Sequence, residues 1–497
     1  MSQPANSAAG DAGRFDDRLA RGRLAALAAP AVPLSAMGLP LAIFVPPFYA
    51  SLFQANGMSA AAALAVVGTT FMLVRVFDLV TDPIMGVVGD HFESRWGRRR
   101  HWCVLATPVI MLGVLLVFIV PVPAAVTPAY LLVSMVIFYT GSTMYTISHY
   151  AWGAEISRDY HERSRVTGFI HLASLLGSLT VLVPPAYMEY VVGETAGGRM
   201  AVLAFGLYVI ALLPIATGIA VTLVPERRTA PAPKISFWQG GRLVLSNRHM
   251  RRILLADLMV GIPGPVMASV FIFFLRDVVG GDKWNSIILI FFYGVTVAGV
   301  PFWLRVSRRL GKHRAFAISC IAHMVFIALF LTCGPGDVLG FALLVLACGF
   351  VHAGQPMLLR SMTADVVDSD NVESGGQRTG LYFSLITMTQ KVGGALAIGI
   401  AYPLLGWLGF SPGAASQTEQ AMDAIRYIYT FLPASALIVA IVAIWGFRLT
   451  REEQERLRAL LEERDAAARA SGDRGPVWER PPAAIAAEGR SEGDAGG

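Results

Sequence analysis

The chain has 497 residues, of which 55% are hydrophobic and only 15% are charged, and its formal net charge is +6. This composition excludes an ordinary soluble globular domain and a charged disordered chain. The length allows about twelve membrane-spanning helices of ~20 residues each. We therefore expect an all-α integral membrane protein.

Apolar runs separated by polar loops predict where the helices lie. In chain order they fall near residues 29–53, 60–88, 102–120, 128–153, 167–192, 200–224, 253–276, 286–304, 315–333, 338–361, 380–408 and 426–447. All four cysteines fall inside these runs without disulfide or zinc spacing, which indicates packing residues.

The runs form two sets of six on either side of a polar, basic stretch that contains prolines. This pattern divides the chain into a cytosolic tail (1–28), a six-helix bundle (29–224), a cytosolic linker (225–252), a second six-helix bundle (253–447) and a cytosolic segment (448–497). The last segment begins as a predicted amphipathic helix and ends in a predicted disordered tail.

Arginine and lysine residues crowd alternate turns between the helices. By the positive-inside rule this alternation places both termini in the cytoplasm, and we expect a multi-pass protein of the cell membrane. The basic turn at 95–100 has a weak counterpart at 308–314 in the second half. Six helices, a basic linker and six more helices predict a major facilitator fold, whose halves rock around a midplane site.

Charged side chains inside the second run are the strongest functional feature. Arg75, Asp78 and Asp82 are spaced three and four residues apart, so they share one helix face. Each charge costs roughly 2.5–3.5 kcal/mol at the bilayer centre, which favours a functional role. The structural alternative is that Arg75 only neutralises Asp78.

Two carboxylates one turn apart repel unless a proton or another cation lies between them. Sodium prefers oxygen ligands, and the hydroxyl of Thr81 adds a third oxygen beside Asp78 and Asp82. His149 in the fourth run changes charge near physiological pH and favours protons over sodium. We predict a Na⁺ or H⁺ site at these four residues, no other metal and no cofactor.

Two further groups of residues are candidates for a cavity. Lys391, beside Gln390, lies well inside the eleventh run and needs a carboxylate partner, for which Asp78 and Asp82 are candidates. The alternatives are a static ion pair or a lipid contact. The aromatic candidates on the fourth helix are Tyr145, Tyr150 and Trp152, which either line the cavity with Arg75 or pack against other helices.

Charged pairs at the basic ends of the helices predict gates that open and close as the halves rock. Solvated surface charge is the alternative interpretation. The candidate gate residues are Asp90, Arg98, Arg99, Glu155, Arg163, Asp365 and Asp368.

Five short segments carry a resemblance to a known family, namely Asp78–Gly86, Arg95–Trp102, Ala151–Ser157, Ala364–Asp368 and Lys391–Gly394. They resemble the glycoside–pentoside–hexuronide:cation symporters, the melibiose-permease-like branch of the major facilitators. The resemblance covers roughly residues 30–447 and implies sodium- or proton-coupled uptake of a small solute, often a sugar.

The chain departs from the sugar carriers of that family at several positions. It has Thr81 where they usually have Asn, His149 where they have an aspartate, and a wholly apolar first helix. Thr and His at these positions are more similar to the animal lysophospholipid–sodium symporters of the same superfamily.

The leading interpretation is a cation-coupled symporter of a small solute, with a sugar or glycoside as the family default. A lysolipid symporter and a proton-driven exporter are the alternatives. We find no nucleophile with a base, metal cluster or phosphate loop, and therefore predict no enzyme. The expected partners are the solute and the lipid bilayer, without nucleic acid, and we expect a monomer.

Overall fold

The protein is described from a computed structural model that defines residues 19–92, 94, 97–120, 126–156, 160–193, 198–226, 245–374, 379–412, 417–445 and 447. These residues form helices and no strand, apart from one isolated bridge between Ser94 and Gly97. They include 12 helical stretches that are long and apolar enough to cross a membrane. The prediction of an all-α membrane protein with twelve spans is confirmed.

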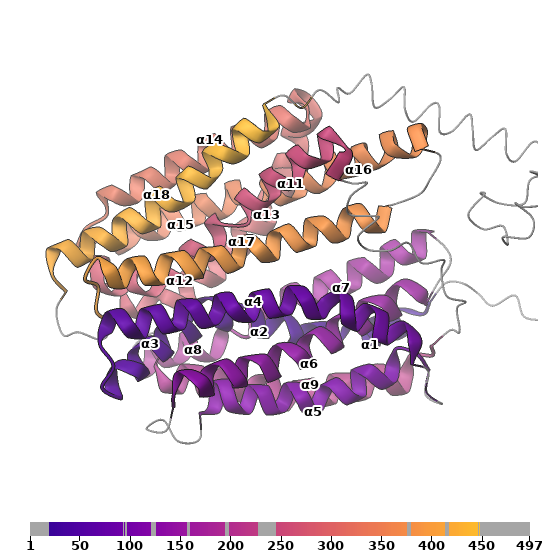
Figure 1. Cartoon of the computed structure of the whole chain (residues 1–497), viewed down its shortest axis with the longest axis horizontal. Coiled ribbons are helices and arrows are strands. Elements are labelled where there is room, and N and C mark those ends of the chain that lie inside the picture. Colours follow the sequence, from indigo (N-terminus) through magenta and orange to yellow (C-terminus); the bar gives the residue numbers. More distant parts are fainter. Residues whose placement is uncertain are drawn as a thin grey trace, which may run out of the picture. The chain divides into compact units, whose positions relative to one another are not determined.

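The spans of the first half are built from the following elements (Figure 1). They are α1 (Arg21–Ala28), α2 (Ala31–Ile43), α3 (Val45–Ala55), α4 (Ala60–His91), α5 (Arg100–Val114), η1 (Leu115–Ile119), α6 (Pro128–Glu155), α7 (Tyr160–Thr180), α8 (Val183–Tyr187), η3 (Met188–Val192) and α9 (Arg199–Leu223).

The spans of the second half follow in the same way. They are α11 (Arg248–Val260), α12 (Pro263–Phe273), η4 (Phe274–Val279), η5 (Asp282–Trp284), α13 (Asn285–Leu310), α14 (Lys312–Leu329), η6 (Phe330–Thr332), α15 (Val338–His352), α16 (Gly354–Ser374), α17 (Thr379–Trp407) and α18 (Glu419–Ile444).

Several spans are interrupted, and the sequence explains most of the breaks. Proline lacks an N–H and clashes with the carbonyl one turn earlier, so it ends or bends a helix. Pro30 precedes α2, and Pro46 lies at the start of α3. In the seventh span α11 ends at Val260 and α12 begins at Pro263, while Ala353 separates α15 from α16 in the tenth.

Capping side chains fix where other helices begin. The Ser59 hydroxyl accepts a hydrogen bond from the backbone N–H of Ala62, and the Thr127 hydroxyl accepts one from Tyr130. The Asn247 side chain accepts two bonds from the first turn of α11. Each cap satisfies an N–H that has no partner within its own helix.

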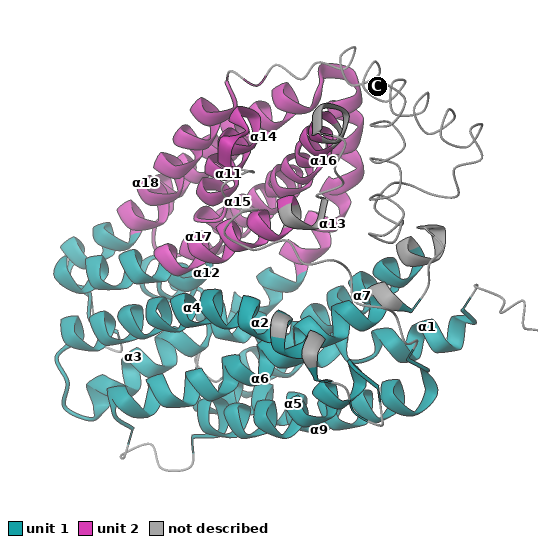
Figure 2. Cartoon of the chain, turned by 45° about the vertical axis from the view of Figure 1, so that its right-hand side comes forward, with its two compact units in different colours: residues 1–233, 268–290, 398–425 teal, residues 234–267, 291–397, 426–497 magenta. Residues whose placement is uncertain are grey.

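The chain forms two compact units, which are coloured separately in Figure 2. Unit 1 comprises residues 1–233, 268–290 and 398–425, and unit 2 comprises residues 234–267, 291–397 and 426–497. Two segments from the second set of spans, residues 268–290 and 398–425, therefore pack within unit 1. The predicted division into tails, linker and bundles remains a prediction, and most of the linker and both tails lie outside the described residues.

Close helix contacts hold the second-half segments within unit 1. A Cβ added at Gly68 of α4 would lie 2.8 Å from Cδ of Pro403, and one at Gly399 would lie 2.9 Å from Sδ of Met72. Only glycine allows α4 and α17 to approach this closely. Within the same unit α5 packs on α6, α2 on α7 and α4 on α6.

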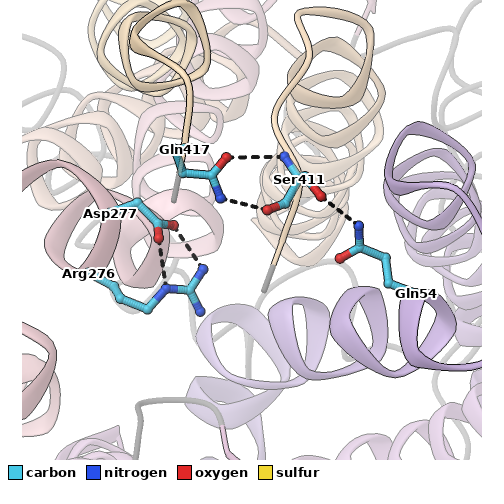
Figure 3. A network of polar contacts seen from close by, with 5 residues as sticks. All are labelled: Gln54, Arg276, Asp277, Ser411 and Gln417. Atoms are coloured by element: carbon cyan, nitrogen blue, oxygen red, sulfur yellow. Dashed lines mark hydrogen bonds and ion pairs between the residues drawn. The ribbon is translucent and has the colours of Figure 1, made fainter. Parts of the chain in front are cut away.

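A polar network joins the loop ends of unit 1 (Figure 3). The side-chain amide of Gln54 donates to the Ser411 hydroxyl at 2.8 Å, and Gln417 donates to the Ser411 carbonyl at 2.6 Å. Separately, Arg276 forms a two-pronged ion pair with its neighbour Asp277 within η4, at 3.0 and 2.8 Å. These loop ends are therefore fixed by side-chain hydrogen bonds as well as by helix packing.

Candidate functional site

The paired aspartates meet a third oxygen from another helix. The Thr143 hydroxyl of α6 lies 2.8 Å from Oδ1 of Asp78 and 3.2 Å from Oδ1 of Asp82. Asp78 is only 3% exposed, whereas Asp82 is half-buried. Asp78 lies eight residues from the end of its span, Ala60–Gly86, which corresponds to about 12 Å along the helix. The aspartates and Thr143 form a compact oxygen cluster at membrane depth.

Arg75 lies beside this cluster. Its guanidinium lies 3.8 Å from Oδ2 of Asp78 and 5.0 Å from the ring centre of Tyr139, which is a cation–π geometry. Its side chain is 34% exposed, so the charge neutralises Asp78 only in part. The Thr81 hydroxyl donates to the backbone carbonyl of Asp78 at 3.3 Å, which leaves its lone pairs available to a cation.

The structure places His149 in a buried contact away from the solvent. It is 1% exposed, and its Nε2 lies 2.7 Å from the carbonyl oxygen of Leu27. This contact ties α6 to α1, which indicates a structural role for the imidazole. Its predicted role at the cation site remains a prediction.

The aromatic candidates of α6 point in different directions. Tyr145 is 1% exposed and its hydroxyl lies 2.8 Å from the Thr217 hydroxyl. Trp152 is also 1% exposed, while Tyr150 is 49% exposed. Tyr145 and Trp152 therefore pack between helices, and Tyr150 is the one available to a solute or to lipid.

Unit 2 contains a second intramembrane carboxylate that the sequence analysis missed. Asp257 of α11 is fully buried and accepts hydrogen bonds from the hydroxyl of Thr389 at 2.7 Å and the amide of Gln390 at 3.1 Å. Both donors lie on α17. Asp257 thus holds the predicted cavity residue Gln390 in place. Lys391 is half-buried on the same helix, and its pairing with Asp78 or Asp82 remains a prediction.

A cavity of about 610 Å³ opens beside this carboxylate, within unit 2. It lies where two interrupted spans meet α17, a common arrangement for transporter sites. The lining residues are Val260, Gly261, Gly264, Pro265, His352, Ala353, Pro356, Met357, Arg360 and Gln390. The lining is mainly apolar, with Arg360 as its charged member.

Two arrangements hold the basic ends of the helices. In unit 1 the Glu226 carboxylate accepts hydrogen bonds from the backbone N–H groups of Arg98 at 2.6 Å and Arg99 at 2.7 Å, and so caps α5. In unit 2 Lys312 pairs with the buried Asp365, with N–O distances of 2.7 and 2.6 Å. Side chains of the remaining predicted gate residues lie outside the described part, namely Asp90, Glu155, Arg163 and Asp368.

The comparisons with known proteins agree with this architecture. The family model described as "MFS/sugar transport protein" matches residues 26–451. The sodium-dependent lysophosphatidylcholine symporter 1 of Xenopus tropicalis is 24% identical over 86% of both chains. The putative glycoside/cation symporter YagG of Escherichia coli is also 24% identical, over 86% of this chain and 92% of its own length.

A solved structure shows the same fold. The nucleoside transporter NupG superposes with a TM-score of 0.62 at 12% identity, over 86% of this chain and 100% of its own. The predicted resemblance to cation symporters of the major facilitator type is confirmed. The chain belongs to the MFS/sugar transport protein family, whose relatives here are membrane transporters.

Proposed function

We propose that the chain is a symporter that couples the uptake of a small solute to Na⁺, bound by Asp78, Asp82 and Thr143. The printed names of two relatives, a sodium-dependent lysophosphatidylcholine symporter and a glycoside/cation symporter, support cation coupling and leave two solute classes. We place the protein in the cell membrane, with both termini cytoplasmic, as a monomer.

The observation that carries the proposal is the meeting of three oxygens with a single hydroxyl proton. The Thr143 hydroxyl lies within hydrogen-bond distance of an oxygen of Asp78 and of one of Asp82, yet it has only one proton to donate. A cation between the two carboxylates would offset the repulsion of charges that lie one helical turn apart. A cluster of oxygens from two carboxylates and one hydroxyl suits the binding of a hard cation such as Na⁺.

Sodium fits this site better than a transition metal because all of its candidate ligands are oxygens. A proton on Asp82 would satisfy the same geometry and would make the protein proton-coupled. The buried contact of His149 with the Leu27 carbonyl suits a structural role for the imidazole, which supports Na⁺ over a proton in this proposal. The half-buried position of Asp82 gives an ion access to the cluster.

The test is accumulation in proteoliposomes, with an inward Na⁺ gradient or an inward proton gradient imposed separately. A panel of radiolabelled glycosides and lysolipids identifies the solute class. We expect the wild-type protein to accumulate one class above equilibrium only with the Na⁺ gradient. Asp82→Asn should abolish accumulation because the substitution removes the charge that balances the cation.

A matched control separates this effect from a general effect of the substitution. Asp337 caps α15 by accepting a bond from the N–H of Gly340, and Asn is an equally good cap. Asp337→Asn should therefore accumulate the solute as the wild type does. Undiminished Na⁺-driven accumulation by Asp82→Asn would contradict the proposal, and accumulation driven only by protons would replace Na⁺ with H⁺.

A further inference from the structure

The cavity of unit 2 contains an arginine that forms no ion pair with another residue that the structure describes. Arg360 lies on α16, within the span Val338–Val367, and lines the cavity. Among the described residues no carboxylate lies within 4.0 Å of its guanidinium. Charged groups at membrane depth are costly and mark solute or ion pathways.

The nearby carboxylate already has its partners. Asp257 interacts electrostatically with Arg360, but its Oδ2 accepts from Thr389 and its Oδ1 accepts from Gln390. The guanidinium has five N–H donors in a planar fork, which matches the two oxygens of a carboxylate or a phosphate. Because Arg360 is exposed and lines the cavity, its guanidinium is accessible to such an acceptor on another molecule.

The rest of the cavity suits an uncharged body. Val260, Pro265, Pro356 and Met357 supply apolar surface. Gln390, oriented by Asp257, adds a polar group at the wall. The volume of about 610 Å³ lies within the range of sites for drug-sized ligands. One cation on an apolar wall favours an amphiphile that carries one anionic group.

The backbone around the cavity is tightly constrained. A Cβ added at Gly393 of α17 would lie 2.7 Å from the carbonyl oxygen of Leu258, so the glycine lets α17 approach the break between α11 and α12. This approach brings Gln390 to the wall that Gly261 also lines. The cavity is therefore a consequence of the packing of these helices.

We propose that this cavity binds the transported solute and that Arg360 binds its anionic group, a carboxylate or a phosphate on an amphiphilic molecule. The inference deepens the proposed function by naming the class of solute, and it rests on that function for the step from binding to transport. Arg360 acts as a specificity-determining residue, while Asp257 positions Gln390.

The test compares ligands that differ in the anionic group. The first pair is p-nitrophenyl β-D-glucuronide and p-nitrophenyl β-D-glucoside, which differ in one carboxylate. The second pair is a lysophosphatidic acid and the monoacylglycerol with the same acyl chain, which differ in one phosphate. Binding is measured by calorimetric titration of full-length protein in nanodiscs, without Na⁺. We expect at least one anionic ligand to bind tenfold more tightly than its neutral partner, and the pair that responds identifies the source of the anion.

Substitutions then assign the preference to Arg360. Arg360→Gln should lower the affinity for the anionic ligand at least tenfold, which is about 1.4 kcal/mol, and remove the preference. Arg360→Lys keeps the charge without the fork and should lose less. Arg309→Gln, on α13 outside the cavity lining, is the matched control. Met357→Trp fills the cavity and should weaken binding even if Arg360→Gln fails to fold.

Several results would overturn the inference. In the first, Arg360→Gln binds the anionic ligand with the affinity of the wild type. In the second, the wild type binds both members of each pair equally well. In the third, the wild type binds neither anionic ligand. The titration contains no Na⁺, so its outcome does not depend on the cation site proposed at Asp78, Asp82 and Thr143. Failure of the Na⁺ proposal and failure of this inference are therefore distinguishable.

Discussion

Thr143→Val tests the oxygen cluster with the smallest change in shape. The substitution replaces the hydroxyl that lies 2.8 Å from Asp78 and 3.2 Å from Asp82 with a methyl group. A hydrogen bond to a charged group contributes about 1.5–3 kcal/mol, and more is lost when the acceptor stays buried. If that energy acts on the bound cation, its affinity falls about 10- to 150-fold.

The assay is Na⁺-dependent thermal stabilisation of protein in nanodiscs, with choline as the replacement cation. A ligand at 100 times its Kd stabilises the folded state by about 2.7 kcal/mol, so the midpoint of the Na⁺ titration reports affinity. Thr143→Ser keeps the hydroxyl and should stay close to the wild type. A midpoint for Thr143→Val within twofold of the wild-type value would refute a role of Thr143 as a ligand.

Three further predictions concern packing inside the units: an ion pair, a close helix contact and a buried carboxylate. Lys312 and Asp365 form an ion pair, so Lys312→Gln and Asp365→Asn should each lower the free energy of unfolding by about 1–3 kcal/mol. The double variant should lose less than the sum of the two losses, and a double-mutant cycle in chemical denaturation measures this difference. Gly393→Ala places a Cβ 2.7 Å from a backbone carbonyl oxygen and should lower the free energy of unfolding by about 1–3 kcal/mol. In the control Gly394→Ala the nearest atom lies 3.7 Å from the new Cβ, so its melting temperature should equal that of the wild type. Glu189 is fully buried and accepts two bonds from the first turn of α13, so Glu189→Ala should lower the melting temperature more than Glu189→Gln; equal loss would contradict the capping role.

The sequence predicted the spans and the shared face of the aspartates because both depend on local periodicity. Apolar runs mark the spans, and the four-residue spacing of Asp78 and Asp82 places them one turn apart. Thr143 escaped prediction because it is 65 residues from Asp78 in the chain. A threonine in an apolar helix has no local feature that distinguishes a ligand from a packing residue.

Other residues were missed although the sequence contained the information. Asp257 lies in an apolar run, as Asp78 does, and the rule that intramembrane acids are functional applies to both. Arg360 was placed at the edge of a predicted helix, whereas the structure continues α16 to Ser374. Lys312, the partner of Asp365, was assigned only to the basic turn at 308–314, because the pairing of α14 with α16 depends on tertiary packing.

The most direct measurement of the central claim is equilibrium binding of ²²Na⁺ to the purified protein. We expect saturable binding by the wild type that is lost in Asp82→Asn. Asp337→Asn should retain it. Binding of ²²Na⁺ by Asp82→Asn with wild-type affinity, or no saturable binding by the wild type at any pH, would contradict a sodium site at Asp78, Asp82 and Thr143.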